Sequence, residues 1–258
     1  MKNKTILNHI FLFTFFIALV LITNNLIKNH FLSQGITSYN IHLLVKTISN
    51  LILGVISFLV SKKLDLLKLG GLSKVKTEKS WLLIFPLGFL VLLNLIFLDS
   101  IPNYSSFNLI ILIIYCLSIG FSEELSIRSV LLPLISRYFG NDRKAKVKAI
   151  FISALIFGFL HLIKFDKGLY GEITQVFYAT FIGVMFGGVL LVVKRIYPLI
   201  IIHAAIDFVG KLDSINTPVK ESVSNSMDIE SALFTILLTL PCLMYGLYVI
   251  KKQLIPTS

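Results

Sequence analysis

Long apolar runs separated by short polar connectors make up almost the whole chain. A helix that crosses a bilayer needs about 20 predominantly apolar residues. Runs that approach or exceed this length occur at residues 6–27, 41–61, 81–98, 107–136, 147–163, 172–193, 196–210 and 231–250. The fourth run is too long for one helix perpendicular to the membrane, and the fifth and the seventh are short. The pattern predicts an all-α polytopic membrane protein, a bundle of about eight transmembrane helices.

The composition supports this prediction. Hydrophobic residues make up 56% of the chain and charged residues only 14%, against about 25% charged residues in an average soluble protein. This excludes a soluble globular enzyme, a disordered regulator and a nucleic-acid-binding protein. Cys116 and Cys242 both lie inside apolar runs, so we expect small buried hydrophobic side chains and no disulfide framework. No linker or internal repeat divides the chain, which we interpret as a single integral-membrane domain of residues 1–258.

The net charge of +11 is concentrated in the connectors. With a cytoplasmic N-terminus, the connectors on the cytoplasmic side hold 17 of the 24 Lys and Arg residues, and those on the other side hold 5. The remaining two, Lys46 and Arg128, lie inside predicted spans. An excess of Lys and Arg on the cytoplasmic side is the pattern that orients membrane proteins. We therefore expect a multi-pass protein of the cell membrane with both termini in the cytoplasm, and with the lipid bilayer, not nucleic acid, as a partner.

Three charged residues lie inside the fourth run, although a charge in hydrocarbon costs from about 2.5 to well over 10 kcal/mol. Adjacent glutamates, here Glu123 and Glu124, point about 100° apart on a helix, so they cannot share one role. Glu124 and Arg128 are four residues apart, in the favourable order for an ion pair on one helical face. Glu123 is left to face something else. The structural alternative is a buried ion pair plus a glutamate near the water interface.

Two histidines lie deep in the short runs. His161 is in the fifth run, and His203 is in the seventh, four residues before Asp207 on the same helical face. Taken alone, His161 fits a neutral core histidine, and His203 with Asp207 fits an interhelical hydrogen-bonded pair. The other histidines lie near the ends of the first two runs: His9, His30 and His42. Because a shared polar site lowers the cost of every buried group in it, one cluster explains the set more economically than three unrelated defects.

Paired carboxylates with histidines suit the activation of water, because one group takes the proton while others stabilise an oxyanion. The chain has no H-E-x-x-H or G-x-S-x-G signature and no evident Cys–His motif, so no soluble-protease pattern competes. Two histidines and glutamates are also possible zinc ligands, but spacing across three helices does not select zinc over a metal-free site. The residues alone therefore predict an intramembrane hydrolytic or proton-handling site.

Three motifs resemble those of one known family. Glu123-Glu124-x-x-x-Arg128, Phe157-x-x-x-His161 and His203-x-x-x-Asp207 are similar to the motifs of the CPBP family. This family comprises CAAX-type prenyl endopeptidases and bacteriocin-processing or bacteriocin-immunity membrane proteins. The resemblance covers the motif-bearing core, residues 107–210. It departs from the family pattern at Ser129, where many relatives have glycine, and at Asp207, where prenyl-processing members resemble each other in having asparagine.

The resemblance implies an intramembrane endopeptidase that hydrolyses peptide bonds of a membrane-associated peptide or protein. By this resemblance, Glu123 and His161 would hold and deprotonate the attacking water. Glu124 and Arg128 would form the supporting pair that tunes Glu123.

The third motif would meet the oxyanion through His203 and Asp207. An ionised carboxylate repels an oxyanion, so Asp207 would either be protonated or act one step back by orienting His203. Although the family has long been called a metalloprotease family, water activated by a glutamate needs no ion. We therefore expect a glutamate-type enzyme without a cofactor, with zinc as the alternative.

Two other functions fit the same residues. A non-catalytic bacteriocin-immunity or membrane scaffold protein would bind its partner through the same helices. A proton-coupled transporter would use the glutamates as a proton relay, but it would be expected to show discontinuous helices or repeats around a midplane site, and the sequence shows neither clearly.

Overall fold

The computed structural model describes residues 3–164, 167–220 and 227–254, and over these residues the chain is helical without a strand. Within the described residues, nine α-helices follow one another: α1 Asn3–Ser33, α2 Tyr39–Lys63, α3 Ile84–Ile96, α4 Ser106–Glu124, α5 Leu132–Tyr138, α6 Arg143–Leu160, α7 Gly168–Val193, α8 Tyr197–Val209 and α9 Ile229–Val249. Short 3-10 turns lie at Ser80–Leu83, His161–Ile163 and Leu212–Ser214, and π-helical turns at Leu125–Leu131 and Ile250–Leu254.

Each of the eight predicted apolar runs forms a helix, and the fourth run contains both α4 and α5. Six of the described helical segments are long and apolar enough to cross a membrane, whereas α8 and the segment of α3 are shorter apolar helices. At about 1.5 Å per residue, the 13 residues of α8 extend about 20 Å, less than the roughly 30 Å hydrocarbon core. The chain is a multi-pass helical membrane protein, and α8 is shorter than the hydrocarbon core of a bilayer.

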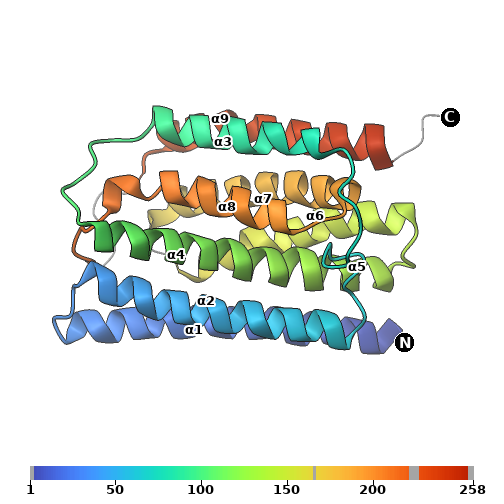
Figure 1. Ribbon diagram of the computed structural model, residues 1–258, viewed down its shortest axis with the longest axis horizontal. Coiled ribbons are helices and arrows are strands. Elements are labelled where there is room, and N and C mark those ends of the chain that lie inside the picture. The colour runs from blue at the N-terminus through green and yellow to red at the C-terminus, as the bar shows by residue number, and fades with distance from the viewer. Residues whose placement is uncertain (1–2, 165–166, 221–226, 255–258) are drawn as a thin grey trace.

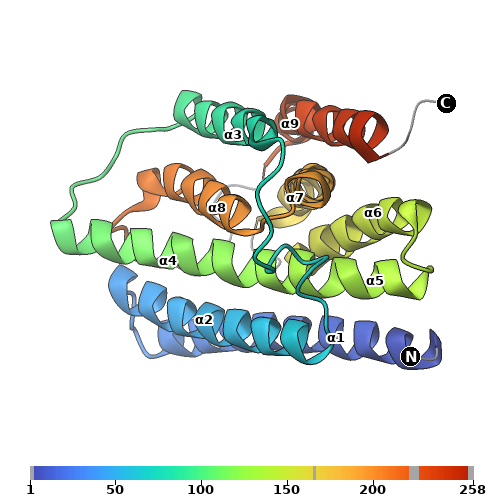
Figure 2. The same cartoon turned by 45° about the vertical axis from the view of Figure 1, so that its right-hand side comes forward.

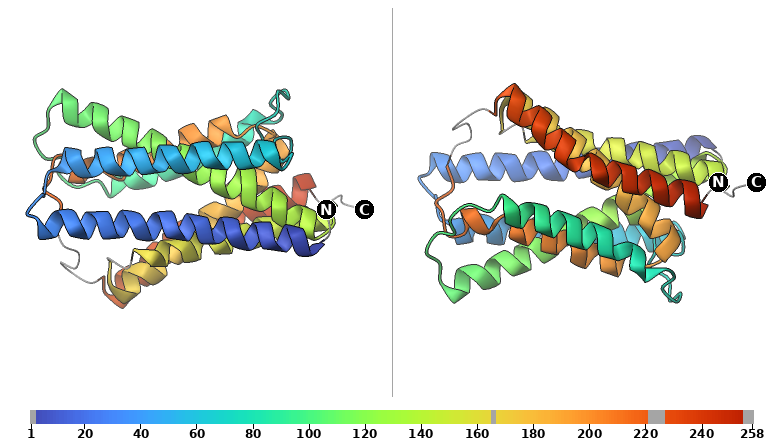
Figure 3. Two further views of the ribbon diagram at one scale, coloured as in Figure 1. Left: turned by 90° about the horizontal axis from the view of Figure 1, so that it is seen from below. Right: turned by 90° about the horizontal axis from the view of Figure 1, so that it is seen from above.

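The helices are arranged in layers (Figure 1). The pair α1 and α2 covers one side of the bundle, and the pair α3 and α9 covers the opposite side. The segments that carry the three motifs, on α4, α6 and α8, lie between these pairs together with α7 (Figure 2). Views from the two sides show α1 and α2 in front of one face, and α3 and α9 in front of the other (Figure 3). The fold therefore encloses the motif-bearing core between helices that carry no motif.

The bundle is apolar on its surface and holds polar side chains in its interior. Large hydrophobic side chains such as Phe11, Leu26 and Leu237 are exposed, as expected of residues that face lipid. Several serines are buried instead: Ser57, Ser61, Ser118, Ser122, Ser126, Ser129, Ser136 and Ser153. Cys116 and Cys242 are free and buried, which confirms that they are small core side chains.

Small residues set how closely the central helices approach. A Cβ atom on Gly120 of α4 would lie 2.5 Å from the carbonyl oxygen of Ile200 on α8. Likewise, a Cβ atom on Gly183 of α7 would lie 2.8 Å from the Cβ of Ala154 on α6. Close helix contacts of this kind are typical of membrane proteins. The Gly183–Gly187 spacing therefore packs α7 against α6 within the bundle.

Successive helical segments run in alternating directions, so α1 begins and α9 ends at the same end of the bundle (Figure 1). The connector from α2 to α3 and the turn from α5 to α6 lie at this same end. These are the connectors that the charge pattern assigns to the cytoplasm, so the fold groups the basic connectors as that pattern requires. A cytoplasmic position of this end stays a prediction.

Candidate active site

The two glutamates of the first motif lie at the end of α4, directly before a π-helical turn. Leu125–Leu131 is π-helical, and at its end the backbone N–H of Leu132 donates to the carbonyl oxygen of Ile127, five residues earlier. Single π turns inside α-helices are frequent at functional sites. The turn falls between Glu124 and α5, and it contains Arg128.

Glu124 and Arg128 form the predicted ion pair. Nη1 of Arg128 lies 3.1 Å from Oε1 of Glu124, and both side chains are almost fully buried, at 1% and 0% exposure. The contact is an ion pair without hydrogen-bond alignment, since both terminal guanidinium nitrogens lack an acceptor among the described residues. Instead the guanidinium carbon lies 4.8 Å from the ring centre of Phe157 and 5.6 Å from that of Phe186, where cation–π attraction contributes.

His203 joins the two glutamates. Its Nδ1 lies 2.8 Å from Oε1 of Glu124, and its Nε2 lies 3.4 Å from Oε2 of Glu123. The close approach of α8 to α4 at Gly120 makes these contacts possible, because a side chain there would displace α8. The two glutamates differ in exposure, since the side chain of Glu123 is 29% exposed and that of Glu124 is 0% exposed. Glu124 is therefore the buried anchor of His203, and Glu123 is the carboxylate that solvent can reach.

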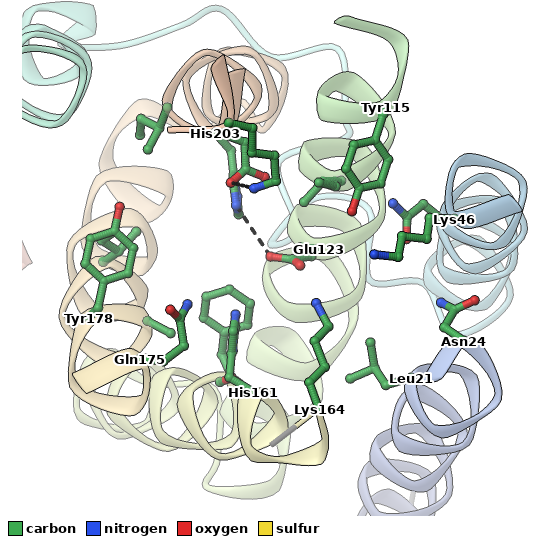
Figure 4. Close-up of a pocket in the computed structure, with 18 of the residues that line it drawn as sticks. Leu21, Asn24, Lys46, Tyr115, Glu123, His161, Lys164, Gln175, Tyr178 and His203 are labelled. Atoms are coloured by element: carbon green, nitrogen blue, oxygen red, sulfur yellow. Dashed lines mark hydrogen bonds and ion pairs between the residues drawn. The ribbon is translucent and has the colours of Figure 1, made fainter. Parts of the chain in front are cut away.

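His161 directly follows α6, at the start of a 3-10 turn, and its ring points toward the same site. Its Nδ1 lies 2.8 Å from the carbonyl oxygen of Phe157. A carbonyl oxygen only accepts hydrogen bonds, so Nδ1 must carry the proton, and Nε2 of the neutral ring is an acceptor. His161 and Glu123 both project toward the space between α4, α6 and α7 (Figure 4).

Asp207 makes a contact that the sequence analysis did not expect. Its Oδ1 accepts a hydrogen bond of 2.9 Å from Nζ of Lys211, whereas the ring nitrogens of His203 contact the two glutamates. Partial burial would lower the pKa of Lys211, but the Asp207 carboxylate outweighs this effect and raises the pKa above its ordinary value. Asp207 and Lys211 therefore form an ion pair. The hydrogen bond of Asp207 is with Lys211, whereas the third motif led us to expect a contact in which Asp207 orients His203.

These groups surround one cavity of about 210 Å³, to which Glu123, His161, His203 and Asp207 all contribute. A second cavity of about 40 Å³ also borders Glu123 and His161, and it is lined by residues of α1 and α2 as well. The larger cavity is lined by Lys164 and Lys211, which follow α6 and α8, as well as by Glu123 and His203; α6 and α8 end at the end of the bundle opposite the two termini (Figure 1). Residues far apart in the sequence therefore meet around a single cavity.

Several lining residues were not identified from the sequence. They are Asn24, Lys46, Asn50, Tyr115, Tyr178, Lys164 and Lys211. The spacing of Asp207 and Lys211 is that of an ion pair on one helical face and is a signal for their contact. Lys46 lies inside a predicted span, which is a second signal. Asn50 donates to the hydroxyl of Ser118 at 3.1 Å. No sequence pattern indicates this contact between α2 and α4.

Among the described residues, no three His, Cys, Asp or Glu side chains are grouped so that they could hold a metal ion. Nδ1 of His161 lies near the carbonyl oxygen of Phe157 and Nδ1 of His203 near Glu124, an arrangement that metal-ligating histidines also show. An enzyme without a cofactor stays a prediction, and we derive no step through a metal.

Carboxylates and histidines that meet around a cavity inside a bundle of membrane helices mark a candidate functional site. Residues 105–209 match the family model described as Rce1-like type II CAAX prenyl endopeptidase. The match covers the stretch that carries all three motifs, and it confirms the family resemblance. Searches with the chain found no significant match among curated proteins and none among solved structures. The family match supports a CAAX-type intramembrane protease, a hydrolase.

Proposed function

We propose that the protein hydrolyses a peptide bond of a membrane-associated peptide or protein with a water molecule activated by Glu123 and His161. The observation that carries this proposal is the convergence of Glu123, His161 and His203 on one cavity. A protease in the membrane needs a place where water, a base and oxyanion donors meet away from lipid. The cavity provides the base and the donors, and it has room for water and part of a peptide.

Glu123 acts as the general base. It is the only one of the two adjacent glutamates with solvent-exposed surface, so it can reach a water molecule and transfer its proton to the leaving amine. Glu124 is committed to Arg128 and to His203. The two adjacent carboxylates therefore have separate roles. The buried Glu124 positions His203, and the exposed Glu123 acts as the base beside His203.

His161 holds the attacking water. Because its Nδ1–H is used by the carbonyl oxygen of Phe157, its Nε2 presents a lone pair that accepts a hydrogen bond from water. The carboxylate of Glu123 accepts the other proton of the same water. Two acceptors fix the oxygen lone pair toward the peptide carbonyl, and orientation of this kind contributes much of the rate enhancement of enzymes.

His203 supplies the donor for the oxyanion. Placed between two carboxylates, an imidazolium donates from both ring nitrogens, through Nδ1 to Glu124 and through Nε2 toward Glu123. The contact to Glu123 is the longer one. When Glu123 takes a proton from water it loses its charge, and Nε2–H is then released to the oxyanion that forms. Preorganised donors of this kind are worth about 10²–10³ in turnover.

The proposal is tested with the purified protein in liposomes and a pool of lipid-anchored peptides, with mass spectrometry to detect new fragments. We expect the wild type to cleave members of the pool, and Glu123→Gln and His161→Ala to slow cleavage at least 100-fold. Glu78→Gln is the matched control, because Glu78 is a surface carboxylate in an ion pair with Lys194. Cleavage by Glu123→Gln at the wild-type rate would overturn the assignment, and so would a wild type that cleaves nothing.

A further inference from the structure

Arg128 carries a buried charge whose position is set mainly by aromatic rings. Its side chain is 1% exposed, and its two terminal nitrogens lack hydrogen-bond acceptors among the described residues. The carboxylate of Glu124 supplies the countercharge, but without aligned hydrogen bonds it does not fix the direction of the guanidinium plane. The guanidinium carbon lies over the rings of Phe157, at 4.8 Å, and of Phe186, at 5.6 Å. These two rings therefore hold the cation on the sides that hydrogen bonds leave open.

Each of the two rings also meets a histidine of the proposed active site. The ring centres of Phe157 and His161 are 4.8 Å apart, with their planes at 87°. Those of Phe186 and His203 are 6.0 Å apart, with their planes at 78°. Both are edge-to-face contacts at separations that aromatic pairs prefer. Phe157 belongs to the second motif, whereas Phe186 lies on α7, outside all three motifs.

The backbone that carries Phe186 is packed from two sides. A Cβ atom on Gly183 would lie 2.8 Å from the Cβ of Ala154 on α6. On the other side, a Cβ atom on Gly246 of α9 would lie 2.9 Å from the Cα of Met185, the neighbour of Phe186 in the sequence. The side chain of Phe186 is itself fully buried. Because close-packed interiors resist small displacements, the ring keeps a fixed place beside the active site.

We infer that Phe186 is a positioning residue that sets the tilt of the His203 ring. The contact of Nδ1 with Glu124 fixes one atom of the imidazole and leaves the ring free to swing about that atom. The edge-to-face contact with Phe186 restricts this swing, and Arg128 in turn holds Phe186. Nε2 of His203 is then kept 3.4 Å from the carboxylate of Glu123 (Figure 4), where the proposed oxyanion forms. The inference deepens the proposed function and rests on it.

The test changes the charge distribution of the ring and leaves its size nearly unchanged. Phe186 is replaced in the full-length protein by mono-, di- and trifluorophenylalanine, because each fluorine weakens the attraction of the ring face for a cation. Phe181 receives the same series as the matched control, since it is a buried residue of the same helix whose ring meets that of Phe177.

Two measurements follow each protein in liposomes. Solid-state NMR with nitrogen-15-labelled histidine gives the proton–nitrogen dipolar coupling of the His203 ring, which falls when the ring moves more. The signal of His203 is the one that disappears in His203→Gln. This readout needs no catalysis, whereas cleavage of a lipid-anchored peptide gives kcat and KM separately.

We expect the dipolar coupling of His203 to fall with each fluorine added at Phe186, and kcat to fall at least tenfold in the trifluoro protein. KM should stay within twofold, because the donor that His203 supplies acts on an oxyanion present only in the transition state. The series at Phe181 should leave all three quantities unchanged. A His203 signal that does not respond at Phe186, or an equal response at Phe181, would overturn the inference. A loosened His203 in a protein whose wild type cleaves nothing would overturn the proposed function and keep Phe186 as the residue that positions His203.

Discussion

Nδ1 of His203 lies 2.8 Å from Oε1 of Glu124, and this contact ties the short helix α8 to the end of α4. The same carboxylate oxygen lies 3.1 Å from Arg128, so Glu124 contacts Arg128 and His203 at once. Its neighbour Glu123 makes the longer contact to His203 and keeps exposed surface. Adjacent residues of the same type therefore differ in burial and in contacts, which supports the proposal that Glu124 is structural and Glu123 is the base.

Replacing the two glutamates separately should reveal this difference. Glu124→Gln leaves Arg128 buried without its countercharge, and loss of one partner of a buried ion pair costs about 3–5 kcal/mol. Glu123→Gln changes a partly exposed side chain and should cost less than about 1 kcal/mol. Thermal unfolding in detergent measures both. Equal destabilisation by the two changes would contradict the assignment of Glu124 as the anchor.

The close approach of α8 depends on Gly120. A Cβ atom there would meet the carbonyl oxygen of Ile200 at 2.5 Å, so Gly120→Ala must push α8 away from α4 and lengthen the contact between His203 and Glu124. Overpacking of this kind costs about 1–3 kcal/mol, and peptide cleavage should fall with it. Gly88→Ala is the matched control, since a Cβ atom on Gly88 meets nothing within 4 Å. Full activity in Gly120→Ala would show that the site tolerates displacement of α8.

Asp207 should matter through the acceptor that it offers Lys211. Asp207→Asn keeps an oxygen that can accept from Nζ of Lys211, while Asp207→Ala removes it and leaves the ammonium of a partly buried lysine without this partner. We expect Asp207→Asn to retain activity within about tenfold and Asp207→Ala to lose more than that, with steady-state cleavage as the measurement. Equal loss in both variants would mean that the charge of Asp207, and not its acceptor oxygen, is what the site needs.

The mouth of the cavity should face away from the cytoplasm. Lys164 lines the cavity and is exposed, and it follows α6, which ends at the end of the bundle opposite the one that groups the basic connectors. A cysteine at Lys164 should therefore react with a membrane-impermeant maleimide applied to intact cells, and one at Lys74, in the connector after α2, should react only after the cells are opened. The buried Cys116 and Cys242 keep the background low. The reverse pattern would invert the predicted orientation.

The fold was predictable because every apolar run long enough to need a bilayer also forms a helix. The π-helical turn at Leu125–Leu131 was not, since its sequence contains neither proline nor glycine and differs little from that of the flanking α-helices. For the same reason, the sequence predicted a single long run at residues 107–136, whereas the structure divides it into α4 and α5 at the π-helical turn. Such a turn is selected by packing against other helices, which no local pattern records.

The site was predictable where its contacts are local. The pairing of Glu124 with Arg128 follows from their spacing on one helix. Asp207 and Lys211 have the same spacing, but their contact was not predicted, because Asp207 was assigned to His203 instead. The contact of His203 with both glutamates depends on how closely α8 lies against α4, and the small residue that permits it, Gly120, carries no chemistry of its own. Contacts between helices therefore need the structure, although the residue types already indicated that the groups belong together.

The most direct test of the account is hydrolysis in water enriched in oxygen-18, because it follows the atom that the proposed base activates. The reconstituted wild type and the Glu123→Gln variant are given the same cleaved peptide, and the new C-terminal carboxyl group is analysed by mass spectrometry. The account predicts one oxygen-18 atom in the wild-type product after a single turnover, and at least a 100-fold slower appearance of that product in the variant. Labelled product that forms at the same rate in both proteins would contradict it.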